Sequence, residues 1–157
     1  MGRMYVGSFE NVAVTAAQDF FEIDPATNKT VVIHGFGIYQ YSDLADAAEE
    51  ILRLSVVRGH TTSGSGGSTM TPAPLSSSAD TAAGDTTIEI NNTTIASTAG
   101  TTLYVHYMNI RAGIEVWYPP EARPVASAAD TTIVLRLLAA PTDSLSMGGF
   151  IVFEEVG

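Results

Sequence analysis

The chain has 157 residues, no cysteine and a formal net charge of −10, with 17 acidic against 7 basic side chains. A length of this order is typical of one domain, residues 1–157, and the absence of thiols excludes disulfides and thiolate metal sites. The negative charge disfavours a nucleic acid partner, because its phosphates would be repelled.

Strand signals dominate the chain from its beginning. Runs rich in β-branched and aromatic residues alternate with turn-forming residues, a pattern typical of short strands. Two or three strands are expected within 4–23, and single strands at 30–41, 51–57, 87–90, 102–110, 114–118, 131–138 and 149–156. This spacing predicts an all-β fold, a β-sandwich, and we expect the jelly-roll type.

Alternation in two of these runs predicts one buried and one solvated face. Aliphatic residues at positions 52, 54 and 56 alternate with Arg53 and Ser55. Those at 133, 135 and 137 alternate with Arg136 in the same way. We expect Arg53, Ser55 and Arg136 to face solvent.

One segment has helical character. Leu44, Ala47, Ala48 and Ile51 recur at three- and four-residue spacing, and a serine or aspartate at 42–43 could cap the start. One short helix is expected near residues 43–50.

A long Gly/Ser-rich segment covers residues 59–80 and has the composition of a flexible linker. Two domains of about seventy residues would each be marginal, so we interpret it as a loop of one domain. Ordering it costs about 1–2 kcal/mol per residue, which contacts must offset. We expect contacts with a neighbouring chain; the alternative is a loop lying flat on its own sandwich. The expected interface residues are Arg58, His60, Met70, Pro72, Pro74 and Leu75.

Catalytic and metal signatures are missing. His34 and His106 lie in strands without a second ligand two residues on, so no metal site is expected. No serine lies in a Gly-x-Ser-x-Gly elbow, and the Gly/Ser segment lacks the lysine of a phosphate-binding loop. We therefore expect no enzyme and no cofactor. A signal peptide and a transmembrane span are not expected either, so no membrane partner is predicted.

Aromatic residues beside carboxylates form the one ligand-like cluster. Trp117 and Tyr118 lie close to Glu115 and Glu121, a combination that recurs in sugar-binding sites. The simpler interpretation is a strand end stopped by the two prolines at 119–120. Trp117 and Tyr118 remain candidates for stacking on a glycan.

Three segments carry a resemblance to a known class of proteins: "FENVAVTAAQDFFEI" (9–23), "EEILRLSVVRGHTTSGSGGSTMTPAPL" (49–75) and "TTIVLRLLAAPTDSLSMGGFIVFEE" (131–155). Together they resemble capsid decoration, or cement, proteins of tailed bacteriophages. The resemblance implies a jelly-roll sandwich, with residues 58–74 in a characteristic loop and 135–141 as a core strand and its exit. It implies no active-site residue.

The same resemblance sets the functional expectation. The chain would be a non-enzymatic structural virion protein that bridges neighbouring capsid subunits, with the major capsid protein and copies of itself, as a homotrimer, for partners. Its location would be the phage head, after synthesis in the host cytoplasm. The alternative is a glycan- or receptor-binding sandwich module of a phage tail or fibre.

Overall fold

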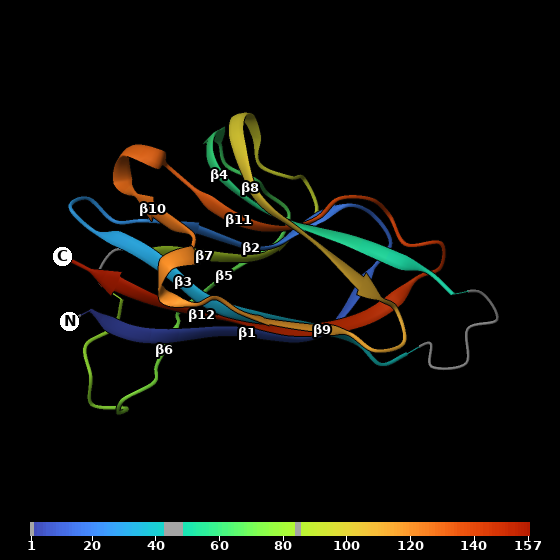
Figure 1. Ribbon diagram of the computed structural model, residues 1–157, viewed down its shortest axis with the longest axis horizontal. Helices are drawn as coiled ribbons and strands as arrows, with labels where there is room; N and C mark the ends of the chain where they lie inside the picture. Colours follow the sequence, from blue (N-terminus) through green and yellow to red (C-terminus); the bar gives the residue numbers. More distant parts are fainter. Residues whose placement is uncertain (1, 43–48, 84–85) are drawn as a thin grey trace.

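The protein is a two-layer β-sandwich (Figure 1). The computed structural model describes residues 2–42, 49–83 and 86–157. One sheet has the order β10 (Val125–Ser127), β3 (Thr30–Gln40), β12 (Leu145–Val156), β1 (Arg3–Val14) and β6 (Ala73–Pro74), and β9 (Ile114–Trp117) also pairs with β3. The other has the order β5 (Ser68–Met70), β7 (Thr87–Asn92), β2 (Gln18–Asp24), β11 (Ile133–Leu137), β4 (Ile51–Thr62) and β8 (Ser97–Asn109). Two short 3₁₀ turns, η1 (Pro120–Ala122) and η2 (Ala128–Asp130), flank β10.

The all-β sandwich expected from the sequence is confirmed. Every predicted strand is present, with the N-terminal stretch forming two strands, β1 and β2. The jelly-roll strand order stays a prediction. The helix expected near 43–50 falls on residues 43–48, which lie outside the described residues; Glu49 and Glu50 are not helical, and β4 begins directly after them.

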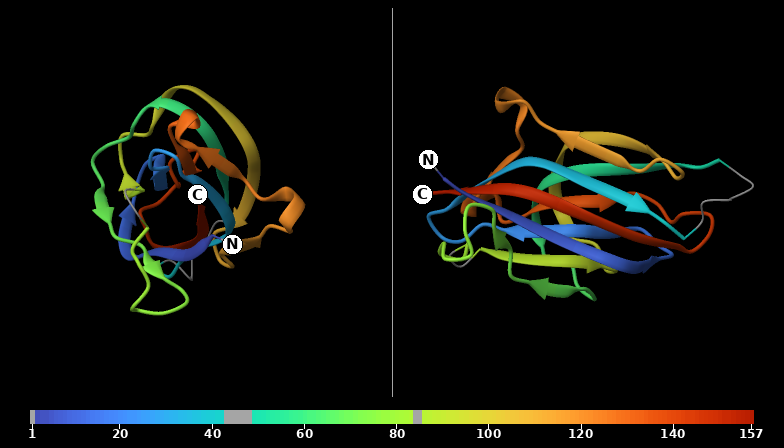
Figure 2. Two further views of the ribbon diagram at one scale, coloured as in Figure 1. Left: turned by 90° about the vertical axis from the view of Figure 1, so that its left-hand side faces the viewer. Right: turned by 90° about the horizontal axis from the view of Figure 1, so that it is seen from below.

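The core lies between the inner faces of the sheets, which close around it when seen end-on (Figure 2). Phe9 from the first sheet stacks on Phe20 at 5.7 Å between ring centroids and contacts Phe21 at 5.4 Å. Tyr5 and Phe153 stack at 5.6 Å, and all of these rings are buried. Each buried side chain of this size contributes about 1.5–3 kcal/mol of hydrophobic stabilisation, so these rings and the buried aliphatic side chains around them together hold the two sheets against each other.

The outer face of the second sheet is not solvated as expected. Arg53 is exposed, but Ser55 and Arg136 are buried, with 1% and 8% exposed. Arg136 pairs with the fully buried Asp19 at 2.5 Å (Nε to Oδ1) and 3.0 Å (Nη2 to Oδ2), and also donates to the carbonyl of Ala96. The prediction was wrong because the chain at Ala96 crosses this face and covers it.

The Gly/Ser-rich segment is also more regular than a loop. β4 continues into it as far as Thr62, Ser65 forms a bridge with Thr94, and the segment then adds β5 to the second sheet and β6 to the first. A segment that pairs with both sheets is part of the sandwich rather than a free connection.

Its main anchor is the carboxyl group of Glu22, which is fully buried on the outer side of β2. The hydroxyl of Ser63 donates to it at 2.7 Å, the amide of Gly64 at 3.0 and 3.2 Å, and the side-chain amide of Asn92 at 2.9 Å. We call these four residues the Glu22 clamp. Burial of a carboxyl group is tolerated only when its oxygens are hydrogen-bonded, so the clamp explains why this segment stays in place.

Glycine is needed in the clamp for close approach. A Cβ on Gly64 would lie 2.7 Å from the carbonyl oxygen of Thr94 and 2.8 Å from Oε2 of Glu22. Gly66 has φ +87°, a conformation that favours glycine. The glycines that suggest a flexible segment in the sequence therefore allow close packing in the structure.

Replacing Gly64 with alanine should therefore destabilise the fold by about 1–3 kcal/mol, the usual cost of inserting a methyl group into packed atoms. Ser65→Ala is the matched control, because Ser65 is exposed and pairs through its backbone alone; it should stay within about 0.5 kcal/mol of the parent. Urea unfolding measures both. Equal midpoints for Gly64→Ala and the parent would contradict the clamp.

Candidate functional site

A cluster of aromatic side chains lies on the outer face of the first sheet. Trp117 of β9 is 55% exposed and Tyr39 of β3 is 37% exposed, while Phe150 of β12 is half-buried beside them. The ring centroids of Trp117 and Phe150 are 6.2 Å apart. We call Tyr39, Trp117 and Phe150, together with Glu115, the aromatic platform.

Glycines on β3 form the floor of the platform. Gly35 pairs with Trp117, and Gly37 pairs with Glu115 on one side and Phe150 on the other. A Cβ on Gly35 would lie 2.7 Å from Cε3 of Trp117, and one on Gly37 would collide with the ring of Phe150. The rings can cover the β3 backbone only because these positions have no side chain, and the sheet therefore fixes their orientation.

Glu115 is held between two donors of the platform. The indole N–H of Trp117 donates to Oε1 at 2.6 Å, and the hydroxyl of Tyr39 donates to Oε2 at 2.7 Å. These hydrogen bonds, that of Trp117 first, lower the pKa of Glu115, and the bond to Glu115 raises the pKa of Tyr39. An exposed carboxylate with free lone pairs thus lies beside an exposed indole face, an arrangement that can bind hydroxyl or amide donors on a flat apolar partner.

Tyr118 points the other way and is not part of the platform. It is 7% exposed, its hydroxyl lies 2.9 Å from Nε2 of His106, and its ring lies 5.0 Å from that of Tyr104. Burial raises the pKa of Tyr118 and lowers that of His106. These side chains fill the side of the sandwich where β8 faces β9, so Tyr118 is placed for packing and Trp117 for contact.

The six residues expected at an interface are mostly tied to their own chain. Arg58 donates to the carbonyl of Val125 at 2.8 Å and pairs with Asp130 at 3.6 Å. His60 and Pro72 are buried.

The rest of this set follows the short strands of the segment. Met70 lies over Gly7 of β1, and Pro74 pairs with Tyr5. Leu75 is 52% exposed and is the only large apolar side chain of the six that is open to a partner. The interface stays a prediction, but the order of the segment is accounted for by contacts within the chain.

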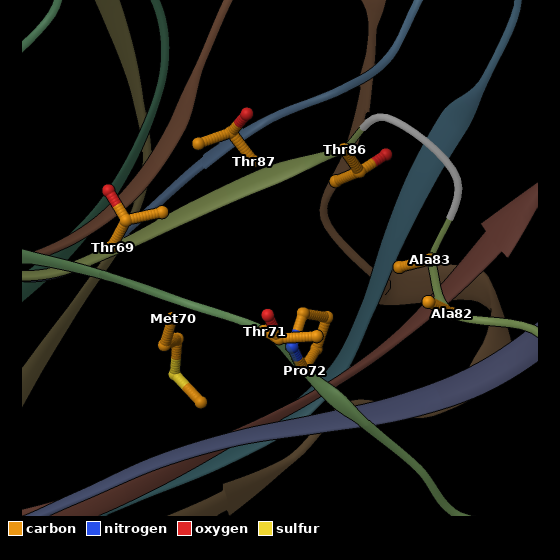
Figure 3. Close-up of a pocket in the computed structure, with 8 residues that line it drawn as sticks. All are labelled: Thr69, Met70, Thr71, Pro72, Ala82, Ala83, Thr86 and Thr87. Carbon is orange, nitrogen blue, oxygen red and sulfur yellow. The ribbon is translucent and has the colours of Figure 1, made fainter.

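A cavity of about 260 Å³ lies beside this segment, between β5, Pro72 and two pairs of residues, Ala82 with Ala83 and Thr86 with Thr87 (Figure 3). Threonine hydroxyls and small apolar groups line it, from Thr69, Met70, Thr71, Pro72, Ala82, Ala83, Thr86 and Thr87. None of these side chains is an acid or base with a free charge. The described side chains of this lining therefore offer neutral hydrogen bonds and apolar contacts.

The intrinsic fluorescence of Trp117 should report the platform, since it is the only tryptophan in the chain. Because the pKa of Glu115 is lowered from 4.5, its carboxylate should lose the indole hydrogen bond only below that pH, and the emission should shift there. Glu115→Gln should abolish the shift, whereas Glu121→Gln should keep it. A midpoint above 4.5 in the folded protein, with folding checked by circular dichroism, would contradict the geometry.

Within the described parts of the chain, no three histidine or acidic side chains are grouped so as to hold a metal ion. No described helix has the length and apolarity needed to cross a membrane. Comparisons with protein-family models, with curated proteins and with solved structures found no match for this chain.

Proposed function

We propose that this protein is a non-enzymatic structural protein of a phage virion, which decorates the head and stabilises it by bridging neighbouring capsid subunits. The proposal extends the resemblance of its sequence segments to cement proteins. One structural observation supports it most: exposed apolar surfaces lie on the outer faces of both sheets, which point in opposite directions. A protein that bridges two neighbours needs two such surfaces.

The second surface lies on β4, β8 and the residue that follows β11. Tyr107 is 65% exposed and pairs with Arg53, Val105 is 44% exposed two residues away, and Ile51 is 55% exposed. Leu138, 39% exposed, is bonded through its amide to the carbonyl of Arg53. We call Ile51, Val105, Tyr107 and Leu138 the β8 strip. Large apolar side chains grouped on the outside of a sheet are typical of protein contact sites.

The position of each surface suggests its partner. β8 is the edge strand of its sheet and has 13 residues, and a long apolar edge is suited to contact with a second copy of the same chain. The aromatic platform lies across β9, β3 and β12 of the other sheet, on a rigid glycine floor. We therefore propose that the β8 strip forms the trimer and that the platform contacts the major capsid protein.

A second candidate function rests on the same platform. Trp117 presents an exposed ring face next to the carboxylate of Glu115, the combination that lets a sugar stack its C–H groups while its hydroxyls donate to oxygen. In a glycan-binding module of a tail or fibre, Trp117 would stack on the sugar and Tyr118 would take no part.

Quantitative mass spectrometry of purified virions tests the leading proposal. A decoration protein should be present in a number of copies of the same order as the major capsid protein.

Two variants test the two surfaces separately. In light scattering, Tyr107→Ser should lower the mass of the oligomer. Trp117→Ser should leave that mass unchanged but weaken addition to preformed heads. Val156→Ser, at an exposed position away from both surfaces, is the matched control and should change neither.

One or a few copies per virion would overturn the decoration proposal. If a glycan array then gave a signal that Trp117→Ser removes and Tyr107→Ser keeps, the second candidate would take its place. If the Trp117→Ser variant added to preformed heads as completely as the parent, the platform would not be the surface that contacts the capsid.

A further inference from the structure

The aromatic platform carries a negative charge within the apolar surface that it offers to a partner. Trp117 and Tyr39 are exposed, and the exposed carboxylate of Glu115 accepts a hydrogen bond from each of them. Its oxygens lie 2.6 Å from the indole nitrogen and 2.7 Å from the tyrosine hydroxyl oxygen. A partner that covers either ring therefore also covers the carboxylate, and must satisfy a charge as well as an apolar surface.

A purely apolar partner would meet this charge unfavourably. The hydrogen bonds from Trp117 and Tyr39 lower the pKa of Glu115, so the carboxylate is ionised at neutral pH. Covering an ionised carboxylate costs free energy that a positive charge or strong hydrogen-bond donors must offset. Among the described residues, no basic side chain forms an ion pair with Glu115. The charge is therefore left for a partner to compensate.

The carboxylate also keeps room for further donors. Each of its oxygens accepts one hydrogen bond within the platform, and a carboxylate has about four lone-pair sites in all. One further donor can therefore bind to each oxygen. Two N–H groups on one side of a planar cation match two carboxylate oxygens.

The indole of Trp117 is suited to the same kind of group. It lies over Gly35, where a Cβ would come within 2.7 Å of Cε3, so β3 supports the ring from below. Tryptophan is the aromatic side chain that attracts cations most strongly. Donation of its N–H to an anion polarises the ring toward more negative charge and strengthens this attraction. The ring and the carboxylate thus attract one cation together.

We propose that the aromatic platform recognises the guanidinium group of an arginine side chain on the protein that it contacts. The inference rests on the proposed function of the platform as a protein contact, and it names the group that the platform selects. The guanidinium plane would cover the exposed indole of Trp117, and its N–H groups would donate to Glu115. Arginine offers both interactions in one group, because it is planar, always charged and only weakly hydrated.

The charge of the whole chain favours a cationic group at this surface. The sequence has 17 acidic and 7 basic side chains, for a formal net charge of −10. A field of this sign attracts positively charged surfaces and speeds their encounter with the protein.

Other groups fit the platform less well. An acidic group would be repelled by Glu115. A lysine ammonium has the required charge, but it is compact and strongly hydrated, so it cannot cover the indole of Trp117 and donate in one plane. A sugar ring, the ligand of the second candidate function, can stack and donate, but it leaves the charge of Glu115 uncompensated.

NMR titration of the indole ¹H–¹⁵N signal of Trp117 tests the inference, because this is the only tryptophan in the chain. The probe is N-acetylarginine amide, which presents one arginine side chain without charged ends. It should shift the signal saturably, with a dissociation constant of about 10–100 mM. N-acetyllysine amide should bind several-fold more weakly. N-acetylcitrulline amide, which keeps the planar shape without the charge, and glucose should bind about tenfold more weakly or not at all.

Glu115→Gln is the decisive variant, because it keeps the size of the side chain and an oxygen acceptor for Trp117 while it removes the charge. It should fold as the parent does and bind the arginine probe about tenfold more weakly at equal ionic strength. Glu121→Gln is the matched control: it removes the same charge at an exposed position outside the platform and should leave binding unchanged.

Equal binding of the arginine probe by Glu115→Gln and the parent would overturn the proposal. So would the absence of binding up to about 200 mM, or binding of the lysine or citrulline probe as tight as that of the arginine probe. Binding of glucose without binding of the arginine probe would overturn it in favour of the second candidate function.

The titration needs no virion, so its failure can be told apart from failure of the decoration proposal. Many copies per virion without binding of the arginine probe would remove the arginine contact alone. One or a few copies per virion together with binding of the probe would remove the decoration role and leave the specificity of the platform for arginine standing.

Discussion

The buried carboxyl group of Glu22 is the constraint on which the rest of the structure depends. It lies on the outer side of β2 and carries no basic partner among its hydrogen bonds, so neutral donors must cover it. The donors come from the Gly/Ser segment and from Asn92, which also donates to Glu89 at 2.7 Å. Leaving such a group without donors in the interior costs far more than ordering the few residues that supply them. A segment with almost no apolar surface is therefore held by polar contacts.

The clamp also positions the surfaces assigned to function. β4 enters it directly, so the end of β4 is fixed beside η2 and the start of β11. After the clamp, the chain adds β5 to the second sheet and β6 to the first. Each of these strands lies at the edge of its sheet opposite to β8 and β9, respectively. The side with β8 and β9 is filled instead by the buried ring of Tyr118 and its neighbours. The side of the sandwich with β5 and β6 is closed by backbone pairing, and the side with β8 and β9 by aromatic packing. The aromatic platform and the β8 strip remain on the outer faces.

The sequence predicted the strands and the inner faces, because period-two alternation records which side of a strand is buried. It failed for Ser55 and Arg136, since alternation cannot indicate that a distant segment covers the outer face. Of the two candidates for stacking on a glycan, the structure exposes Trp117 and buries Tyr118, and the stacking itself stays a prediction. Neighbours in a strand point to opposite faces, so only one of the two could be on the surface. Phe150 could not be found, because its place depends on the pairing of β12 with Gly37.

Glycine was the residue whose role the sequence misrepresented most. Gly, Ser and Thr in a run have the composition of a flexible chain, and no local pattern distinguishes flexibility from close approach. The distinction comes from Glu22, some forty residues earlier, and from Thr94, thirty residues later.

Amide hydrogen exchange at Gly64 tests the central claim most directly. Its N–H is buried and donates to both oxygens of Glu22. The clamp predicts that this amide exchanges as slowly as amides in the middle of β4, such as that of Leu54, because both are exposed only by extensive opening. Exchange as fast as at the exposed Ser76 would show that the Gly/Ser segment moves freely, and would contradict the account.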